Sequence, residues 1–237
     1  MFPSTLVERS WMGDHTPVFP LLSGTGQKEN SMPRCSALIL LAAWLVASGA
    51  QAQSVASNPA LAPAGRYRVV RDHTQVVFWV MHLGLSPYYG RIGGATGNMT
   101  FNPLDPTRST VSIELDTRSL STMSDAVTRA LCTDDAFACA KSPRIGFRST
   151  AIKRTGDTTG EIAGDLTLAG VTKPVTLTAR FHGGMQGPLG QDNYQLGFSA
   201  EATIKRSDFG LTKMIWHPTV SDDVKLLIAA EFEQDKG

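Results

Sequence analysis

Residues 164–181 carry the clearest alternation of apolar and polar side chains in this chain. Leu166 and Leu168 share one parity, and after a short connection a second apolar set follows: Val175, Leu177, Ala179 and Phe181. Because successive side chains of a strand point to opposite faces, the stretch predicts two strands with one apolar and one polar face. The apolar face requires a cover, which is either another protein layer or a ligand.

The same alternation recurs along most of the chain after Gly65. The further alternating stretches are residues 75–82, 111–116, 145–147, 194–205 and 224–233. Residues 75–82 are apolar at both parities, so we expect this strand to be covered on both sides. Glycine, proline, asparagine and aspartate separate the stretches, a pattern typical of antiparallel barrels and sandwiches. We therefore predict an all-β domain of about eight strands.

One segment departs from the strand pattern. Val127, Ala130 and Leu131 follow helical spacing, and Asp125 near the start suits the helix dipole. The spacing predicts a short helical insertion over residues 124–131.

Residues 32–52 have the three parts of a secretory signal peptide. The positive charge of Arg34 precedes an apolar run, and Ala50-Gln51-Ala52 forms a cleavage site of small residues. The run is about 15 residues long, whereas a spanning helix needs roughly 20, so no transmembrane anchor is predicted. We expect export and cleavage after Ala52.

These signals divide the chain into four parts. A signal peptide normally begins at the initiator methionine, so we interpret Met32 as the true start and residues 1–31 as an over-extended N-terminus. Residues 53–64 are small and proline-containing, which is typical of a linker. Residues 65–237 then form the β-barrel domain.

Charge and motif content narrow the classes of function. The chain carries 22 Lys and Arg against 21 Asp and Glu, so bulk electrostatics give no support for binding nucleic acid or an anionic membrane. It contains no G-x-S-x-G, H-E-x-x-H or G-x-G-x-x-G motif, and no two histidines after residue 52 have close metal-ligand spacing. We therefore predict no catalytic residue, no metal site, no cofactor and no nucleic-acid partner.

Cys132 and Cys139 are the cysteines that remain after the signal peptide. On one continuous helix they would lie about 10 Å apart along the axis, too far for a disulfide. Export favours a disulfide, which then requires the helix to break near Thr133, beside Asp134 and Asp135. Free thiols and a redox or metal role remain alternatives.

Three motifs give the chain a family resemblance. Residues 164–175 read Gly-Asp-Leu-Thr-Leu-x-Gly-Val-Thr-Lys-Pro-Val, residues 78–84 read Phe-x-Val-x-His-Leu-Gly, and residues 206–210 read Arg-Ser-Asp-Phe-Gly. In this order and spacing they resemble the YceI-like family of periplasmic, lipocalin-like, polyisoprenoid-binding proteins. The resemblance runs from about Tyr67 to Phe232, nearly the whole chain after the signal peptide.

The resemblance implies a lipocalin-like extended antiparallel β-barrel in the periplasm, with an apolar cavity that holds a long isoprenoid or a similar lipid. It implies no common catalytic activity, and it suggests a homodimer although no residue here marks an interface. Many members carry Arg-Asp-x-His-Leu in the helical insertion, where residues 127–131 of this chain read Val-Thr-Arg-Ala-Leu. The role of that aspartate and histidine is therefore not carried over.

In such a barrel, every second side chain of a strand points inward, and these side chains would line the cavity. The candidates are Phe78, Val80, His82, Val111, Ile113, Leu115, Phe147, Leu166, Leu168, Leu177, Phe198 and Ile228. The apolar candidates can solvate a hydrocarbon but cannot carry out chemistry. His82 either meets a lipid head group at the mouth or, as we favour, hydrogen-bonds within the protein.

Three functions remain. We favour an exported binding protein that holds an isoprenoid or a similar lipid. The second is a non-catalytic stress, adhesion or redox-associated interaction module that uses the outer surface and the cysteine pair. The third is a hydrolase built on the same barrel.

Overall fold

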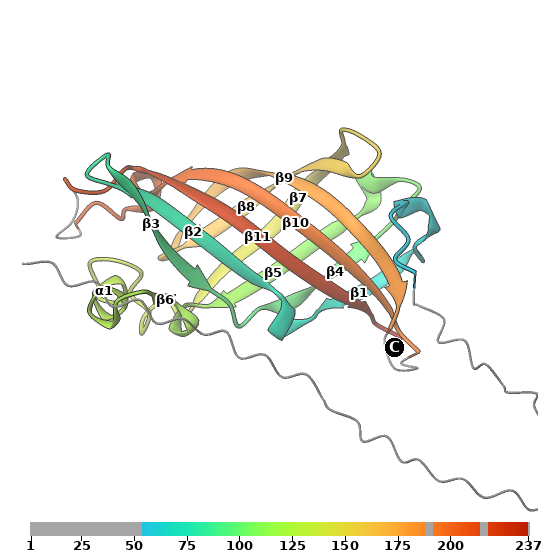
Figure 1. Cartoon of the computed structure of the whole chain (residues 1–237), viewed down its shortest axis with the longest axis horizontal. Coiled ribbons are helices and arrows are strands. Elements are labelled where there is room, and N and C mark those ends of the chain that lie inside the picture. Colours follow the sequence, from blue (N-terminus) through green and yellow to red (C-terminus); the bar gives the residue numbers. More distant parts are fainter. Residues whose placement is uncertain (1–53, 188–191, 214–217, 237) are drawn as a thin grey trace, which may run out of the picture. The chain divides into compact units, whose positions relative to one another are not determined.

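The computed structural model describes residues 54–187, 192–213 and 218–236 (Figure 1). The strands and the helix within them are β1 Gly65–Val69, β2 Gln75–His82, β3 Ser86–Ile92, β4 Thr96–Phe101, β5 Thr110–Asp116, β6 Ser121–Thr122, α1 Asp125–Leu131, β7 Arg144–Arg154, β8 Thr159–Leu168, β9 Val171–Gln186, β10 Tyr194–Lys205 and β11 Asp223–Gln234. The predicted signal peptide, its cleavage site after Ala52 and the extension 1–31 lie outside the described residues.

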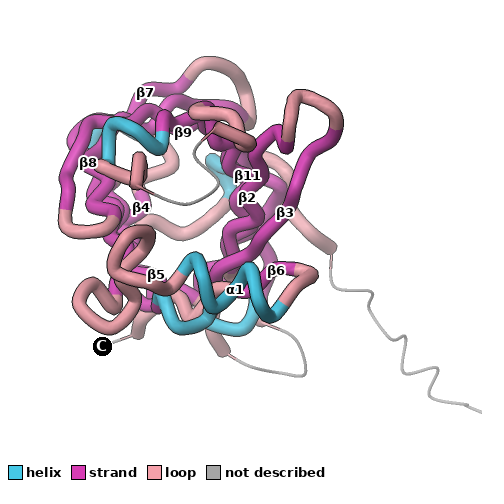
Figure 2. Tube along the Cα trace, turned by 90° about the vertical axis from the view of Figure 1, so that its left-hand side faces the viewer, coloured by secondary structure: helices cyan, strands magenta, loops and turns pink. Residues whose placement is uncertain are grey.

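The strands form a closed antiparallel barrel. Their order is β1-β4-β5-β7-β8-β9-β10-β11, and β11 pairs back with β1 to close the ring. β2, β3 and β6 extend the sheet from β11. Figure 2, which looks into the end that carries α1, shows the strands around a common axis with α1 at the rim. The predicted barrel of about eight strands with a short helical insertion is confirmed.

β1 and β2 behave as one long strand with a kink. β11 pairs with β1 through residues 67–69 and with β2 through residues 75–79, and the 3-10 turn Arg71–His73 lies between these segments. In the same way, β4 pairs with β1 while β3 pairs with β2. On the next strand, β5 pairs with β4 while β6 pairs with β3. The barrel is therefore a meander in which each long strand pairs with the next one along the chain.

Helix α1 covers Asp125–Leu131, within the predicted range. Ser124 caps its first turn, because the Ser124 side chain accepts the N–H of Val127 at 3.4 Å. Asp125 lies in this turn, where its charge suits the helix dipole.

Residues 54–64, which we predicted as a linker, pack along the barrel. Ala56 and Gly184 of β9 exchange two backbone hydrogen bonds, of 2.8 and 3.0 Å. A 3-10 turn, Pro59–Leu61, follows, and the side chain of Asn58 caps it by accepting the N–H of Ala60. This segment is therefore continuous with the barrel's own hydrogen bonding.

An aromatic cluster fills the end of the barrel opposite α1. Tyr67 is fully buried there and packs edge-on against Phe101, whose ring also contacts Phe198. The Tyr67 hydroxyl donates to the backbone oxygen of Pro63 at 2.7 Å. Burial, with a smaller contribution from the nearby Tyr194, raises the pKa of Tyr67 to about 12.

We expect Tyr67 to make the barrel sensitive to alkali. Its pKa is raised on folding, so its contribution is fully present below pH 10 and is lost as the pH rises toward about 12. Tyr67→Phe should therefore flatten the fall in unfolding free energy over this range, as measured by urea titration. At neutral pH the same variant should lose about 1 kcal/mol with the Pro63 hydrogen bond.

The exposed Tyr89 provides the control for this experiment. Tyr89→Phe should retain the alkaline slope of the wild-type protein. An equally steep slope in Tyr67→Phe would show that another group causes the alkaline loss.

Candidate functional site

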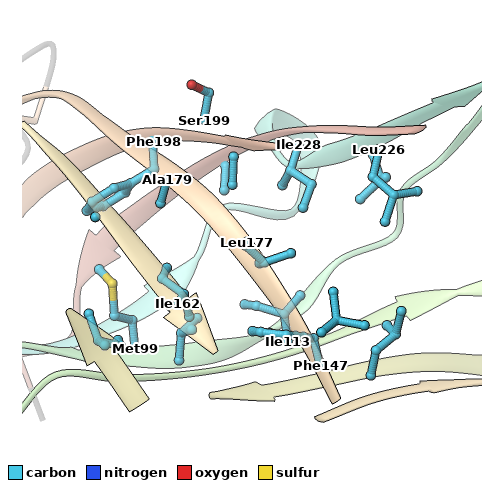
Figure 3. A pocket seen from close by; sticks show the side chains of 18 of the residues that line it. Met99, Ile113, Phe147, Ile162, Leu177, Ala179, Phe198, Ser199, Leu226 and Ile228 are labelled. Carbon is cyan, nitrogen blue, oxygen red and sulfur yellow. The ribbon is translucent and has the colours of Figure 1, made fainter. Parts of the chain in front are cut away.

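The barrel encloses a cavity of about 300 Å³, at the lower end of the range for small-ligand sites. Apolar side chains from nearly every strand form its wall. In Figure 3, Leu177, Phe198 and Ile228 point into one shared space, whereas the side chain of Ser199 points away from it. The inner face that the alternation predicts thus surrounds a space instead of a solid core.

The structure places most of the predicted lining residues in the cavity wall. Those in the wall are Phe78, Val111, Ile113, Leu115, Phe147, Leu166, Leu168, Leu177, Phe198 and Ile228. Val80 is half-buried and His82 is exposed, and neither lines the cavity. Beyond Trp79 the neighbour of β2 changes from β11 to residues 219–221, so the strand runs past the cavity. Val80 and His82 therefore lie outside the cavity wall in which we predicted them.

Some wall residues were missed from the sequence. Met99 and Phe101 of β4 and Ile162 of β8 line the cavity. Met99 and Phe101 share one parity, but Gly97 and Asn98 in the same strand are poor strand formers and weaken the alternation. The signal that could have identified this strand was the shared parity of Met99 and Phe101 directly before the Asn-Pro turn at residues 102–103.

Charged side chains lie only at the ends of the described cavity lining. Arg206, at the α1 end, is buried and donates to the carbonyls of Leu211 and Ser221, at 2.6 and 3.1 Å. At the opposite end, Lys153 and Arg154 at the end of β7 and Asp157 of the β7–β8 turn lie at the rim. The cavity can therefore solvate a hydrocarbon along its length and offers charged contacts only where the chain would leave it.

The described residues hold no group of three His, Cys, Asp or Glu side chains arranged to bind a metal ion. They also contain no helix that is both long and apolar enough to cross a membrane.

A disulfide joins Cys132 and Cys139 at the α1 end of the cavity. α1 ends at Leu131, as a bridge between these cysteines requires, and the N–H of Phe137 donates to the Leu131 carbonyl at 2.9 Å. Phe137 lies inside the bridged loop, lines the cavity and packs on Phe78 with ring centroids 6.4 Å apart. The disulfide therefore holds one side chain of the cavity wall in place.

Comparison with known sequences places this barrel among its relatives. Residues 67–232, which include the closed ring and most of the cavity wall, match the YceI-like domain. The chain belongs to the YceI-like family. A UPF0312 protein of Pseudomonas aeruginosa strain UCBPP-PA14 is 37% identical to this YceI-like chain over 172 residues, covering 72% of this chain and 87% of that protein.

Solved structures agree with the YceI-like assignment. A YCEI protein of Campylobacter jejuni is similar with a TM-score of 0.58 and 28% identity, over 65% of this chain and 90% of that one. A polyisoprenoid binding domain from Saccharophagus degradans, implicated in plant cell wall breakdown, has a TM-score of 0.56 over 71% of this chain and 98% of its own. Its sequence identity is 14%, so this second likeness shows the fold alone.

Proposed function

We propose that this YceI-like protein is a non-enzymatic carrier that binds a long-chain isoprenoid or a similar lipid in the barrel cavity. The observation that carries the proposal is a cavity of about 300 Å³ whose wall is apolar between its two ends. The polyisoprenoid binding domain of Saccharophagus degradans, which shares the fold, supports the choice of ligand class. The head group would stay at an end of the cavity, where the charged side chains lie.

Hydrocarbon burial alone provides adequate affinity. Transferring about ten methylene groups from water into the cavity contributes roughly 0.8 kcal/mol each, or about 8 kcal/mol in total. This corresponds to a dissociation constant of about 1 μM before the cost of ordering the chain is subtracted. A lipid several isoprene units long therefore needs no specific contact along its tail.

We also propose that the protein works in the periplasm, after cleavage behind Ala52. The disulfide between Cys132 and Cys139 supports this location, because disulfides persist in oxidising compartments. Intact-mass measurement of the exported protein should give Gln53 as its first residue. The homodimer suggested by the resemblance stays a prediction, which light scattering would test.

Neighbouring alanines of β11 provide a matched test of the lipid proposal. Ala230 lines the cavity, whereas Ala229 is exposed on the outer face. Ala230→Phe places a ring inside the cavity, and Ala229→Phe places the same ring outside it. We expect wild-type protein and Ala229→Phe to co-purify with lipid in native mass spectrometry, and Ala230→Phe to retain about tenfold less or a shorter chain.

Two checks make this result interpretable. Circular dichroism and a urea titration will show whether Ala230→Phe is folded, since overpacking costs about 1–3 kcal/mol. A lipid-free wild-type protein that also shows no stabilisation by added quinones or polyprenyl phosphates would overturn the proposal. Equal lipid content in the two alanine variants would place the lipid outside the cavity.

A further inference from the structure

Exposed apolar side chains gather around the β2–β3 hairpin. Leu83 and Leu85 form its tip, and Leu85 is 81% exposed. Tyr89 of β3 and Leu227 of β11 are also among the exposed large apolar residues of the described chain. Since soluble proteins rarely expose large contiguous apolar patches without a use, this grouping points to an interaction surface.

The grouping is continuous over the outer faces of three strands. Trp79 of β2 pairs with Tyr89 of β3, and their ring centroids are 6.4 Å apart. Leu227 pairs with Val77, two residue pairs from Trp79 and away from the tip, and Met81 continues the outer face of β2 toward the tip. We call these residues the hairpin patch: Trp79, Met81, Leu83, Leu85, Tyr89 and Leu227. Our expectation that β2 is covered on both sides is wrong for the described residues, since Trp79 and Met81 remain partly exposed.

Positive charge accompanies the hairpin patch. Lys225 lies directly across from Trp79, and Arg91 is two positions along β3 from Tyr89. Lys225 donates to a hydroxyl of Thr203, and Arg91 to that of Ser121, so within the described residues neither cation forms an ion pair. Glu201 of β10, which pairs with Leu227 of β11, marks the acidic edge of the patch.

We propose that the hairpin patch docks the protein on the surface of an anionic lipid bilayer. Tryptophan and tyrosine side chains concentrate at membrane–water interfaces, because their rings are apolar at one end and polar at the other. The two leucines at the tip would enter the acyl region, and Arg91 and Lys225 would meet the anionic head groups. Local composition drives this docking, although the chain as a whole is almost neutral.

Charge favours a bilayer over a second copy of this chain. In a two-fold symmetric dimer the patch meets its own copy, so the interface would hold four cations, Arg91 and Lys225 of each copy, against two edge carboxylates of Glu201. An anionic bilayer instead complements both charges. None of the six patch residues lines the cavity, so the docking proposal is independent of the cavity's contents.

Two exposed leucines at opposite ends of the barrel allow a matched test. Leu85 is at the hairpin tip, and Leu104, 84% exposed, follows β4 at the other end (Figure 1). The mature protein would be floated with phosphatidylcholine vesicles that contain or lack phosphatidylglycerol. We expect binding to the anionic vesicles, a loss of about tenfold or more in Leu85→Glu, and no loss in Leu104→Glu. Lys225→Glu should weaken binding and reduce its dependence on salt.

Each other outcome counts against the docking proposal. Absence of binding by the wild-type protein, or equal losses in Leu85→Glu and Leu104→Glu, would overturn it. Light scattering that shows a wild-type dimer and a Leu85→Glu monomer would assign the patch to a second copy. Native mass spectrometry of Leu85→Glu should show the wild-type lipid content, so a failed docking result remains distinguishable from an empty cavity.

Discussion

Gly97→Ala is expected to destabilise the barrel by about 3 kcal/mol or more, as a fall in the urea midpoint without a change in the slope. Gly97 lies in β4 opposite Ile113, and a Cβ there would lie 2.1 Å from the backbone oxygen of Ser112. That oxygen belongs to β5, which is paired on both sides and cannot retreat. The φ angle of Gly97 is also +135°, a conformation that alanine adopts only with strain.

Gly146 gives the control for this substitution. It lies inside β7, also pairs with β5, and has no atom within 4 Å of the position where a Cβ would be added. Gly146→Ala should therefore change the unfolding free energy by less than about 1 kcal/mol. A Gly97→Ala protein as stable as Gly146→Ala would mean that β4 and β5 can separate without cost to the barrel.

Alternation predicted β2, β5, β8, β9, β10 and β11 but missed β1, β3 and β4, and it did not show how far a strand stays in the ring. The parity of Phe78, Val80 and His82 correctly assigns them to one face of β2. However, parity carries no information on where β11 stops pairing, and that point, at Trp79, decides which of them reach the cavity. Where a neighbouring strand stops pairing depends on residues far away in the sequence, so a local pattern does not predict it.

The close approach between β4 and β5 was also not visible in the sequence pattern. β4 contains Gly97 because the backbone of β5 comes close there, and the same glycine weakens the alternation by which β4 would be recognised. Met99 and Phe101 were therefore missed although they line the cavity. The break after α1, in contrast, was predictable, because the sequence spacing of Cys132 and Cys139 excludes a bridge on a continuous helix.

Removal of the disulfide should loosen the α1 end of the cavity. The bridge closes a short loop, for which chain entropy predicts a loss of about 2.5 kcal/mol of unfolding free energy on reduction. Cys139 is buried and the N–H of Cys139 donates to the Cys132 carbonyl at 3.3 Å, so the loop retains some order without the bridge. Phe137, inside the loop, would then move more freely against Phe78.

The expected result is a lower urea midpoint and faster release of bound lipid after reduction, measured by transfer to excess empty vesicles. The double variant Cys132→Ser, Cys139→Ser should behave like the reduced protein and should not respond to the reductant, which separates the disulfide from other effects of the reagent. A midpoint that falls while the release rate stays constant would mean that lipid leaves by the β7–β8 end, away from Phe137. Constant values of both would mean that the hydrogen bonds between residues 131 and 139 hold the loop without the disulfide.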